Sequence, residues 1–151
     1  MSRILKVFEE FLESGIVKRR SPDILRARSL FDEAEKRWNF LDKLKKKIDL
    51  SDENANYFIE PSYDILIGLV RAKLLADGFS SSGDGAHEAE VAYMQNLNFP
   101  ESDVRFMNDL RYFRNGIKYY GREFGSDYAK KVLAFLNRMY PNLKEVVEGS
   151  I

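Results

Sequence analysis

Apolar residues recur every three or four positions along most of the chain, which is the spacing of one face of an α-helix. The longest run predicts a helix that opens at Ser21, Pro22 and Asp23, because a capping hydroxyl, a proline and an acid each favour a helix N-terminus. Charged residues occupy its other faces, so we expect it to lie on a helical bundle. Its expected inward residues are Ile24, Ala27, Phe31, Ala34, Trp38, Leu41, Leu44 and Ile48.

A shorter helix is expected within residues 1–20, followed by a linker. Ser2 is suited to cap its N-terminus, and Gly15 is suited to end it in a left-handed turn. Its apolar positions are Ile4, Val7, Phe8, Phe11 and Leu12.

A third helix should open at residues 51–53 and end at Gly78. Pro61 falls inside it and is expected to kink or divide it, because proline removes a backbone donor and clashes with the preceding turn. Residues 65–75 are apolar nearly all round, so this part should lie near the centre of the bundle.

The rest of the chain predicts three more helices after a Gly- and Ser-rich stretch over residues 80–85, which reads as a mobile loop. The first spans Ala86 to Leu97, the second begins at Pro100 and runs to about Phe124, and the third follows Gly125. Pro141 is expected to interrupt the third, leaving a separate last turn. No useful length alternates with the period of a strand.

These elements predict an all-α fold, an antiparallel up-and-down bundle of about five to six helices in one domain over residues 1–151. The 44% hydrophobic content is enough for a core, and the absence of cysteine excludes disulfides and thiolate chemistry. The formal net charge is zero, so any nucleic-acid binding needs a local patch. No signal peptide or membrane span is recognised, and a cytoplasmic location is expected.

The helix expected over residues 100–124 carries the most informative polar pattern. On a helical wheel a basic stripe adjoins its core face, and Tyr112 and Tyr119 lie beyond that stripe. Such a surface can hold phosphates and stack bases, and a solvated charged face would give the same pattern. The core face comprises Phe106, Leu110, Phe113, Ile117 and Phe124, with Tyr120 at its margin. The stripe comprises Arg111, Arg114, Asn115, Lys118 and Arg122.

The segment from Arg111 to Gly121 resembles the signature region of the HEPN superfamily, a set of small helical-bundle domains. The family pattern is an Arg, often followed by Asn, and then a His after four to six residues. Arg114 and Asn115 match its first part, and the helix order over residues 51–140 is similar. The resemblance implies a homodimer in which two motifs meet in a cleft. Many members are metal-independent ribonucleases, some of them toxins paired with a nucleotidyltransferase-type antitoxin.

The chain departs from this pattern at the position of the catalytic base. Tyr119 and Tyr120 stand where a His is expected, and an unperturbed tyrosine, with a pKa of about 10, is a poor base near neutral pH. We therefore expect a degenerate nuclease site, with Arg114 and Tyr119 as the catalytic candidates. The expected RNA- or phosphate-binding residues are Arg111, Arg114, Asn115, Lys118 and Arg122.

Two other features bear on this site. His87 is the only histidine of the chain, and it is either a base supplied from another helix or a surface residue. Glu60 and Asp64 stand four residues apart beside Pro61, and they either supply polar groups to a cleft or face water. With one His and no Cys, no metal site and no cofactor are predicted.

Three functions remain open at this point. The first is a non-catalytic module that binds RNA or phosphate. The second is a metal-independent ribonuclease in which Tyr119, Tyr120 or His87 replaces the usual base. The third is an interaction module that binds a nucleotidyltransferase-like protein or a second copy of itself.

Overall fold

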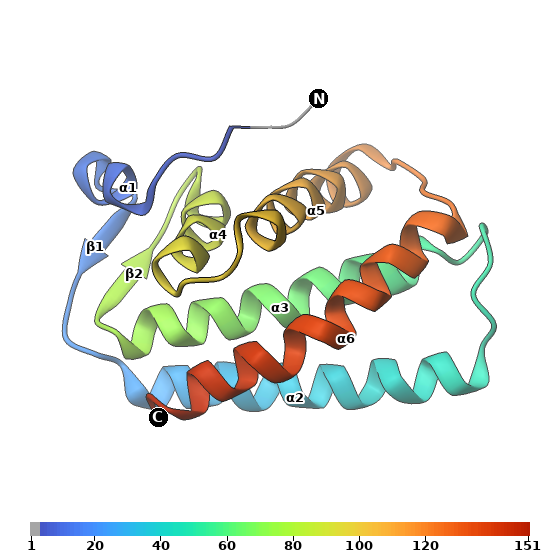
Figure 1. The fold of residues 1–151 in the computed structure, drawn as a ribbon, viewed down its shortest axis with the longest axis horizontal. Helices are drawn as coiled ribbons and strands as arrows, with labels where there is room; N and C mark the ends of the chain where they lie inside the picture. The colour runs from blue at the N-terminus through green and yellow to red at the C-terminus, as the bar shows by residue number, and fades with distance from the viewer. Residues whose placement is uncertain (1–3) are drawn as a thin grey trace.

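The computed structural model describes residues 4–151, and the predicted all-α helical bundle is confirmed (Figure 1). The described residues form six helices and one two-stranded ribbon. The elements are α1 (Phe8–Ser14), β1 (Val17–Arg19), α2 (Ile24–Lys47), α3 (Asn56–Ala76), β2 (Phe79–Ser81), α4 (Ala86–Asn96), α5 (Glu101–Tyr120) and α6 (Ser126–Glu148).

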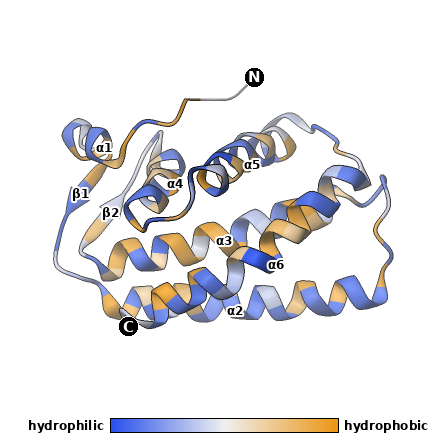
Figure 2. Ribbon diagram, in the orientation of Figure 1, coloured by the Kyte–Doolittle hydropathy of each residue, from blue (hydrophilic) through white to orange (hydrophobic). Residues whose placement is uncertain are grey.

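The central element is α3, which packs against α2, α4, α5 and α6. Figure 1 shows α2 and α3 running antiparallel, α6 crossing over them, and α4 and α5 on the other side of α3. Residues 65–67 and 69–70 of α3 are all buried, as the apolar run predicted. The same run appears as a largely hydrophobic stretch of α3 in Figure 2.

The long helix α2 is fixed to α6 by side chains on one of its faces. Trp38 stacks on Tyr140, with ring centroids 4.1 Å apart, and Lys144 forms an ion pair with Glu35 at 2.9 Å. Another face of α2 lies against α3, where Ala27, Phe31, Ala34 and Leu41 are buried. A third face of α2, which includes Glu33, Arg37 and Phe40, lines hollows at the surface.

Several helix boundaries differ from the prediction. Asp23, not Ser21, caps α2, and its carboxylate accepts a hydrogen bond from the backbone N–H of Arg26 at 3.1 Å. The α3 helix begins at Asn56, after a turn that occupies most of the predicted first turn. The α1 helix ends in a left-handed turn at Gly15, as expected, but it begins at Phe8, so Ile4 and Val7, which were expected within the helix, precede it. The predicted cap Ser2 lies outside the described residues.

The α3 helix is not divided at Pro61, which was one of the two expected outcomes there, and the expected interruption at Pro141 was wrong, because α6 continues past it. At the first site the neighbouring Ser62 and Tyr63 are fully buried. Ser62 also donates its hydroxyl to the carbonyl of Phe58 at 2.6 Å. Tertiary packing therefore holds the helix across a residue that removes one backbone hydrogen bond.

A short antiparallel ribbon, which the sequence did not indicate, joins β1 to β2. Val17 pairs with Ser81, and Arg19 pairs with Phe79. The start of the stretch predicted as a mobile loop is thus a strand. Three-residue strands are too short to show an alternating pattern. No helix in residues 4–151 is long and apolar enough to cross a membrane.

Candidate phosphate-binding site

Arg114 is buried against α3 and does not lie on a solvent-exposed stripe, which corrects the prediction for this residue. Its exposed fraction is 8%. Arg114 follows Leu110 by four residues and precedes Ile117 by three, so it shares the helix face of these two buried residues. The basic stripe predicted for α5 is therefore not one surface.

Arg114 is held by two residues of α3 but is incompletely satisfied. Its Nη2 donates to Asp64 Oδ1 at 2.9 Å, and its guanidinium carbon lies 5.5 Å from the ring centroid of Tyr63. Its Nε is buried and has no hydrogen-bond partner among residues 4–151. A buried donor left unbonded costs about 1–3 kcal/mol. Stability alone therefore does not explain an arginine at this place.

Arg114 lines a pocket of about 370 Å³ where four helices meet. One wall comes from α2 and α3, and the other from α4 and α5. The pocket also contains the only histidine of the chain, His87 at the start of α4. The lining residues are Leu30, Glu33, Ala34, Arg37, Asp64, Ile67, Gly68, Arg71, His87, Arg114 and Lys118.

The cations of this pocket differ in how firmly they are paired. Arg37 pairs with Glu33 at 3.3 Å, and both side chains are about half exposed. Such a pair is weak and rearranges at little cost. Lys118 is exposed, lies 5.6 Å from the ring centroid of Tyr119, and has no ion-pair partner within residues 4–151. Lys118 and Arg37 are therefore the charges most readily offered to an anion.

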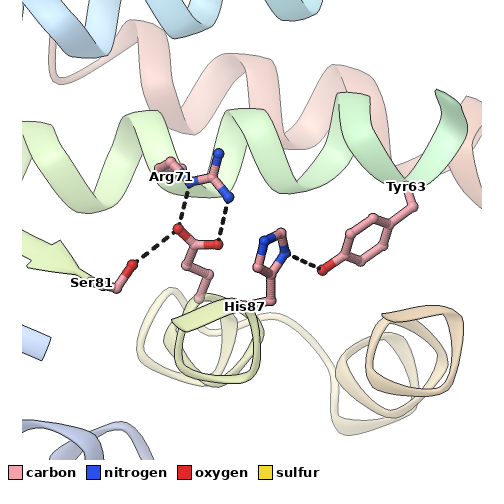
Figure 3. A network of polar contacts seen from close by, with 5 residues as sticks. Tyr63, Arg71, Ser81 and His87 are labelled. Carbon is pink, nitrogen blue, oxygen red and sulfur yellow. Dashed lines mark hydrogen bonds and ion pairs between the residues drawn. The ribbon is translucent and has the colours of Figure 1, made fainter. Parts of the chain in front are cut away.

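Arg71 makes a two-pronged contact with Glu90 of α4 (Figure 3). Its Nε and Nη2 donate to the two carboxylate oxygens at 2.6 and 2.9 Å. Glu90 also accepts a hydrogen bond from the hydroxyl of Ser81 at 3.1 Å, and its side chain is only 1% exposed. This network joins α3, α4 and β2 and fixes the wall that carries His87.

His87 is half-buried, and its Nδ1 lies 3.1 Å from the hydroxyl of Tyr63 (Figure 3). Burial lowers the pKa of His87; the charge of Glu90 opposes this, whereas Arg71 and Arg114 lower the pKa further. The ring is therefore neutral near pH 7. Burial, and next the charge of Glu90, raise the pKa of Tyr63, so its phenol keeps its proton.

The contact between His87 and Tyr63 fits two tautomers with different chemistry. If the phenol donates to Nδ1, then Nε2 carries the proton and can donate to a phosphate oxygen. If Nδ1 donates to the phenol oxygen, then Nε2 is free to accept a proton. The first arrangement suits binding, and the second suits base catalysis.

The other predicted site residues are spread over a wider surface. Arg111 donates from Nε to Asn108 at 3.0 Å, and Asn115 is partly buried outside the pocket lining. Tyr119 is 64% exposed and is not among the lining residues. Only Arg114 and Lys118 of the predicted set meet in the pocket.

Arg122 was expected on the same stripe, but it lies beyond the end of α5. Gly121 takes a left-handed conformation with φ 64°, and the N–H of Arg122 bonds back to the carbonyl of Gly116. The guanidinium of Arg122 then lies 5.1 Å from the ring centroid of Phe124. The helix stops early because the chain turns at this glycine.

Sequence reasoning assigned no role to Arg37, Arg71 or Glu90, and left Asp64 open. Asp64 lies in the pocket, which settles that alternative in favour of a cleft, whereas Glu60 lines a different hollow. A usable signal existed for Arg71, which is one of two charged residues, with Lys73, in the largely apolar run over residues 65–75. Within residues 4–151, no group of three or more His, Asp or Glu side chains is placed to hold a metal ion.

A scan against models of protein families found no match to the chain, and neither did a search of curated proteins. The HEPN relationship therefore stays a prediction from the sequence. The site must be interpreted from its own geometry.

Proposed function

We propose that the pocket between α2, α3, α4 and α5 binds a phosphate group of RNA. The observation that carries this proposal is the convergence of Arg114, Lys118 and His87, which come from two helices, on one pocket. Arginine forks and lysine ammonium groups are the usual ligands of phosphate oxygens.

The pairing pattern supports an anionic ligand. Asp64 orients Arg114, so the guanidinium is in position before a ligand arrives. Lys118 and Arg37 add charge that no buried carboxylate neutralises. His87 in the tautomer protonated at Nε2 adds a neutral donor.

The test measures the binding of a labelled single-stranded RNA by fluorescence anisotropy at several salt concentrations. Lys118→Gln should weaken binding and reduce the slope of log affinity against log salt by about 0.7, the value for one phosphate contact with a single strand. Lys131→Gln, an exposed lysine of α6 outside the pocket, is the matched control. Equal affinity of the Lys118 variant and the control would contradict the proposal.

A second candidate is a metal-independent ribonuclease, favoured by the presence of His87 beside Arg114 in the pocket. In this reaction the Nε2 of His87 would take the proton of the ribose 2′-hydroxyl, and the 2′-oxygen would attack the phosphorus to give a phosphorane that Arg114 would stabilise. Breaking of the bond from phosphorus to the 5′-oxygen would then leave a 2′,3′-cyclic phosphate, and the 5′-oxygen would take a proton from the imidazolium or from water. This assigns the base to His87 in place of Tyr119, which is exposed outside the pocket.

Cleavage of mixed RNA in the presence of a chelator separates the two candidates. A ribonuclease loses its activity on His87→Gln, and the glutamine can still hydrogen-bond to Tyr63. Binding of RNA by the parent chain without cleavage leaves the binding module as the function. The HEPN resemblance carries two more proposals. Sedimentation would test the homodimer, and co-purification would test pairing with a nucleotidyltransferase-type partner.

A further inference from the structure

A second hollow adjoins the proposed phosphate pocket along the seam between α2 and α3. It has a volume of about 460 Å³. It shares Glu33 and Arg37 with the phosphate pocket, so the two hollows form one groove. We call this second hollow the aromatic groove. Its lining residues are Glu33, Lys36, Arg37, Phe40, Leu41, Leu44, Tyr57 and Pro61.

The phosphate pocket and the aromatic groove together follow one stripe of residues on each helix. On α2 the stripe runs through Leu30, Glu33, Arg37, Phe40 and Leu44, with steps of three or four residues. On α3 the matching positions are Tyr57, Pro61, Asp64, Gly68 and Arg71. Since an α-helix rises 1.5 Å per residue, each stripe is about 20 Å long. Because the helices are antiparallel, Phe40 and Leu44 of α2 lie toward the same end of the groove as Tyr57 and Pro61 of α3. The charged positions Glu33, Arg37, Asp64 and Arg71 lie farther toward the phosphate pocket.

Two large aromatic side chains are left open to solvent in the apolar part. Phe40 is 69% exposed, and Tyr57 is 70% exposed. Phe40 follows Arg37 by three residues, so their backbone positions lie about 4.5 Å apart along the axis of α2. A flat apolar group joined to a phosphate would contact both side chains.

We infer that the aromatic groove is a base-binding subsite for single-stranded RNA, in which a base stacks on Phe40 or Tyr57 while its phosphate occupies the adjoining pocket. This inference rests on the proposed function. Stacking on an exposed ring is tolerant of base identity and needs the unpaired bases of a single strand. A duplex, with its bases covered, does not offer that contact.

The surface beyond Tyr57 sets the limit of the groove. On that side Tyr57 also lines a hollow containing Asp52, Glu53, Glu60 and Glu123. These carboxylates repel a phosphate backbone. The strand is therefore expected to enter from the cationic end and stop at the aromatic rings.

The experiment compares two probes of equal length, a single-stranded oligouridylate and the same ribose–phosphate chain without bases. Phe40→Ser and Tyr57→Ser should weaken binding of the base-bearing probe about 5- to 100-fold and leave the abasic probe unchanged. Tyr57→Phe, which keeps the ring, should bind as the parent does. Leu25→Ser, which removes an 83% exposed apolar residue from α2 outside the groove, is the matched control.

The outcomes separate this inference from the proposal on which it rests. If Lys118→Gln weakens both probes while the aromatic variants change neither, the phosphate pocket stands and the base subsite falls. If Phe40→Ser converts a dimer to a monomer in sedimentation without changing RNA affinity, the groove holds a second copy of the chain. If neither probe binds, both ideas fail. The substituted side chains are exposed, so an unchanged melting temperature is the expected check on folding.

Discussion

Two arginines reach the same pocket from different helices, and they are held in different ways. Arg71 makes a two-pronged contact with Glu90, whose carboxylate is also bonded to Ser81. Arg114 makes one hydrogen bond to Asp64, and its buried Nε has no partner among the described residues. The first arrangement is complete and joins three elements. The second leaves one buried donor of Arg114 unbonded, so it stabilises the fold less than the first.

Removing the acid of the complete pair should have the largest effect on the fold. We expect Glu90→Ala to lower the free energy of unfolding by about 3 kcal/mol, because it leaves the guanidinium of Arg71 without its acceptor. Urea denaturation measures this change. If the free energy of unfolding falls by less than about 1 kcal/mol, the pair of Arg71 and Glu90 contributes no more than an exposed ion pair does. The distinction between the two arginines would then be removed.

Replacing the other arginine should affect the ligand far more than the fold. Arg114→Met removes the unbonded Nε and fills similar space, so the free energy of unfolding should stay within about 1 kcal/mol of the parent. RNA affinity should fall about 10- to 100-fold through loss of a charged hydrogen bond. The same urea and anisotropy measurements apply. Strong destabilisation with unchanged RNA affinity would make Arg114 a structural residue like Arg71.

Acid should act on the pocket through His87. Its pKa in the folded chain is lowered by burial, so its contribution to stability is present above the ordinary histidine pKa of about 6.5 and is lost as the pH falls through the lowered value. RNA affinity should change in the opposite sense, because a bound phosphate favours the protonated ring. The measurement is the difference between the parent and His87→Gln in both profiles. Parallel profiles for the two proteins would show that His87 does not titrate in this range.

An exposed ion pair supplies the smallest expected effect. Arg105 and Glu101 meet at 2.9 Å on the outer side of α5, with side chains 54% and 87% exposed. Glu101→Gln should change the free energy of unfolding by no more than about 0.5 kcal/mol, and less in high salt. A larger loss in urea would mean that ion-pair number, and not burial, controls the stability of this bundle.

The helices were predictable because each is marked by a long periodic run and a local start or stop signal. Gly15 and Asp23 did what their residue types favour at helix ends. The expected interruption at Pro141 and the division allowed at Pro61 did not occur. The sequence does not show that buried neighbours such as Tyr63 hold the helix on either side of Pro61. The ribbon was missed since three-residue strands leave no periodic signal.

The site was predictable only in part, for a different reason. Arg114 and Lys118 were found on α5 from their spacing, but burial of Arg114 depends on Asp64 and Tyr63, which stand on α3. No local pattern announces that His87, at the start of α4, reaches the same pocket. Contacts between residues of different helices depend on tertiary packing, and the hydrophobic periodicity of a single sequence does not predict them.

The ribbon gives the chain a long-range closure that the helices alone would lack. Val17 and Ser81 pair although they are roughly 60 positions apart, and contacts of this kind form late because loop closure must come first. Ser81 in turn bonds to Glu90, which holds Arg71. Local opening of β1 would therefore loosen one pocket wall, although β1 supplies no lining residue. The N-terminal strand acts at a distance on how rigidly the site is held. Hydrogen exchange at Ser82, whose N–H donates to the carbonyl of Ile16 across the ribbon, would report the state of the pocket.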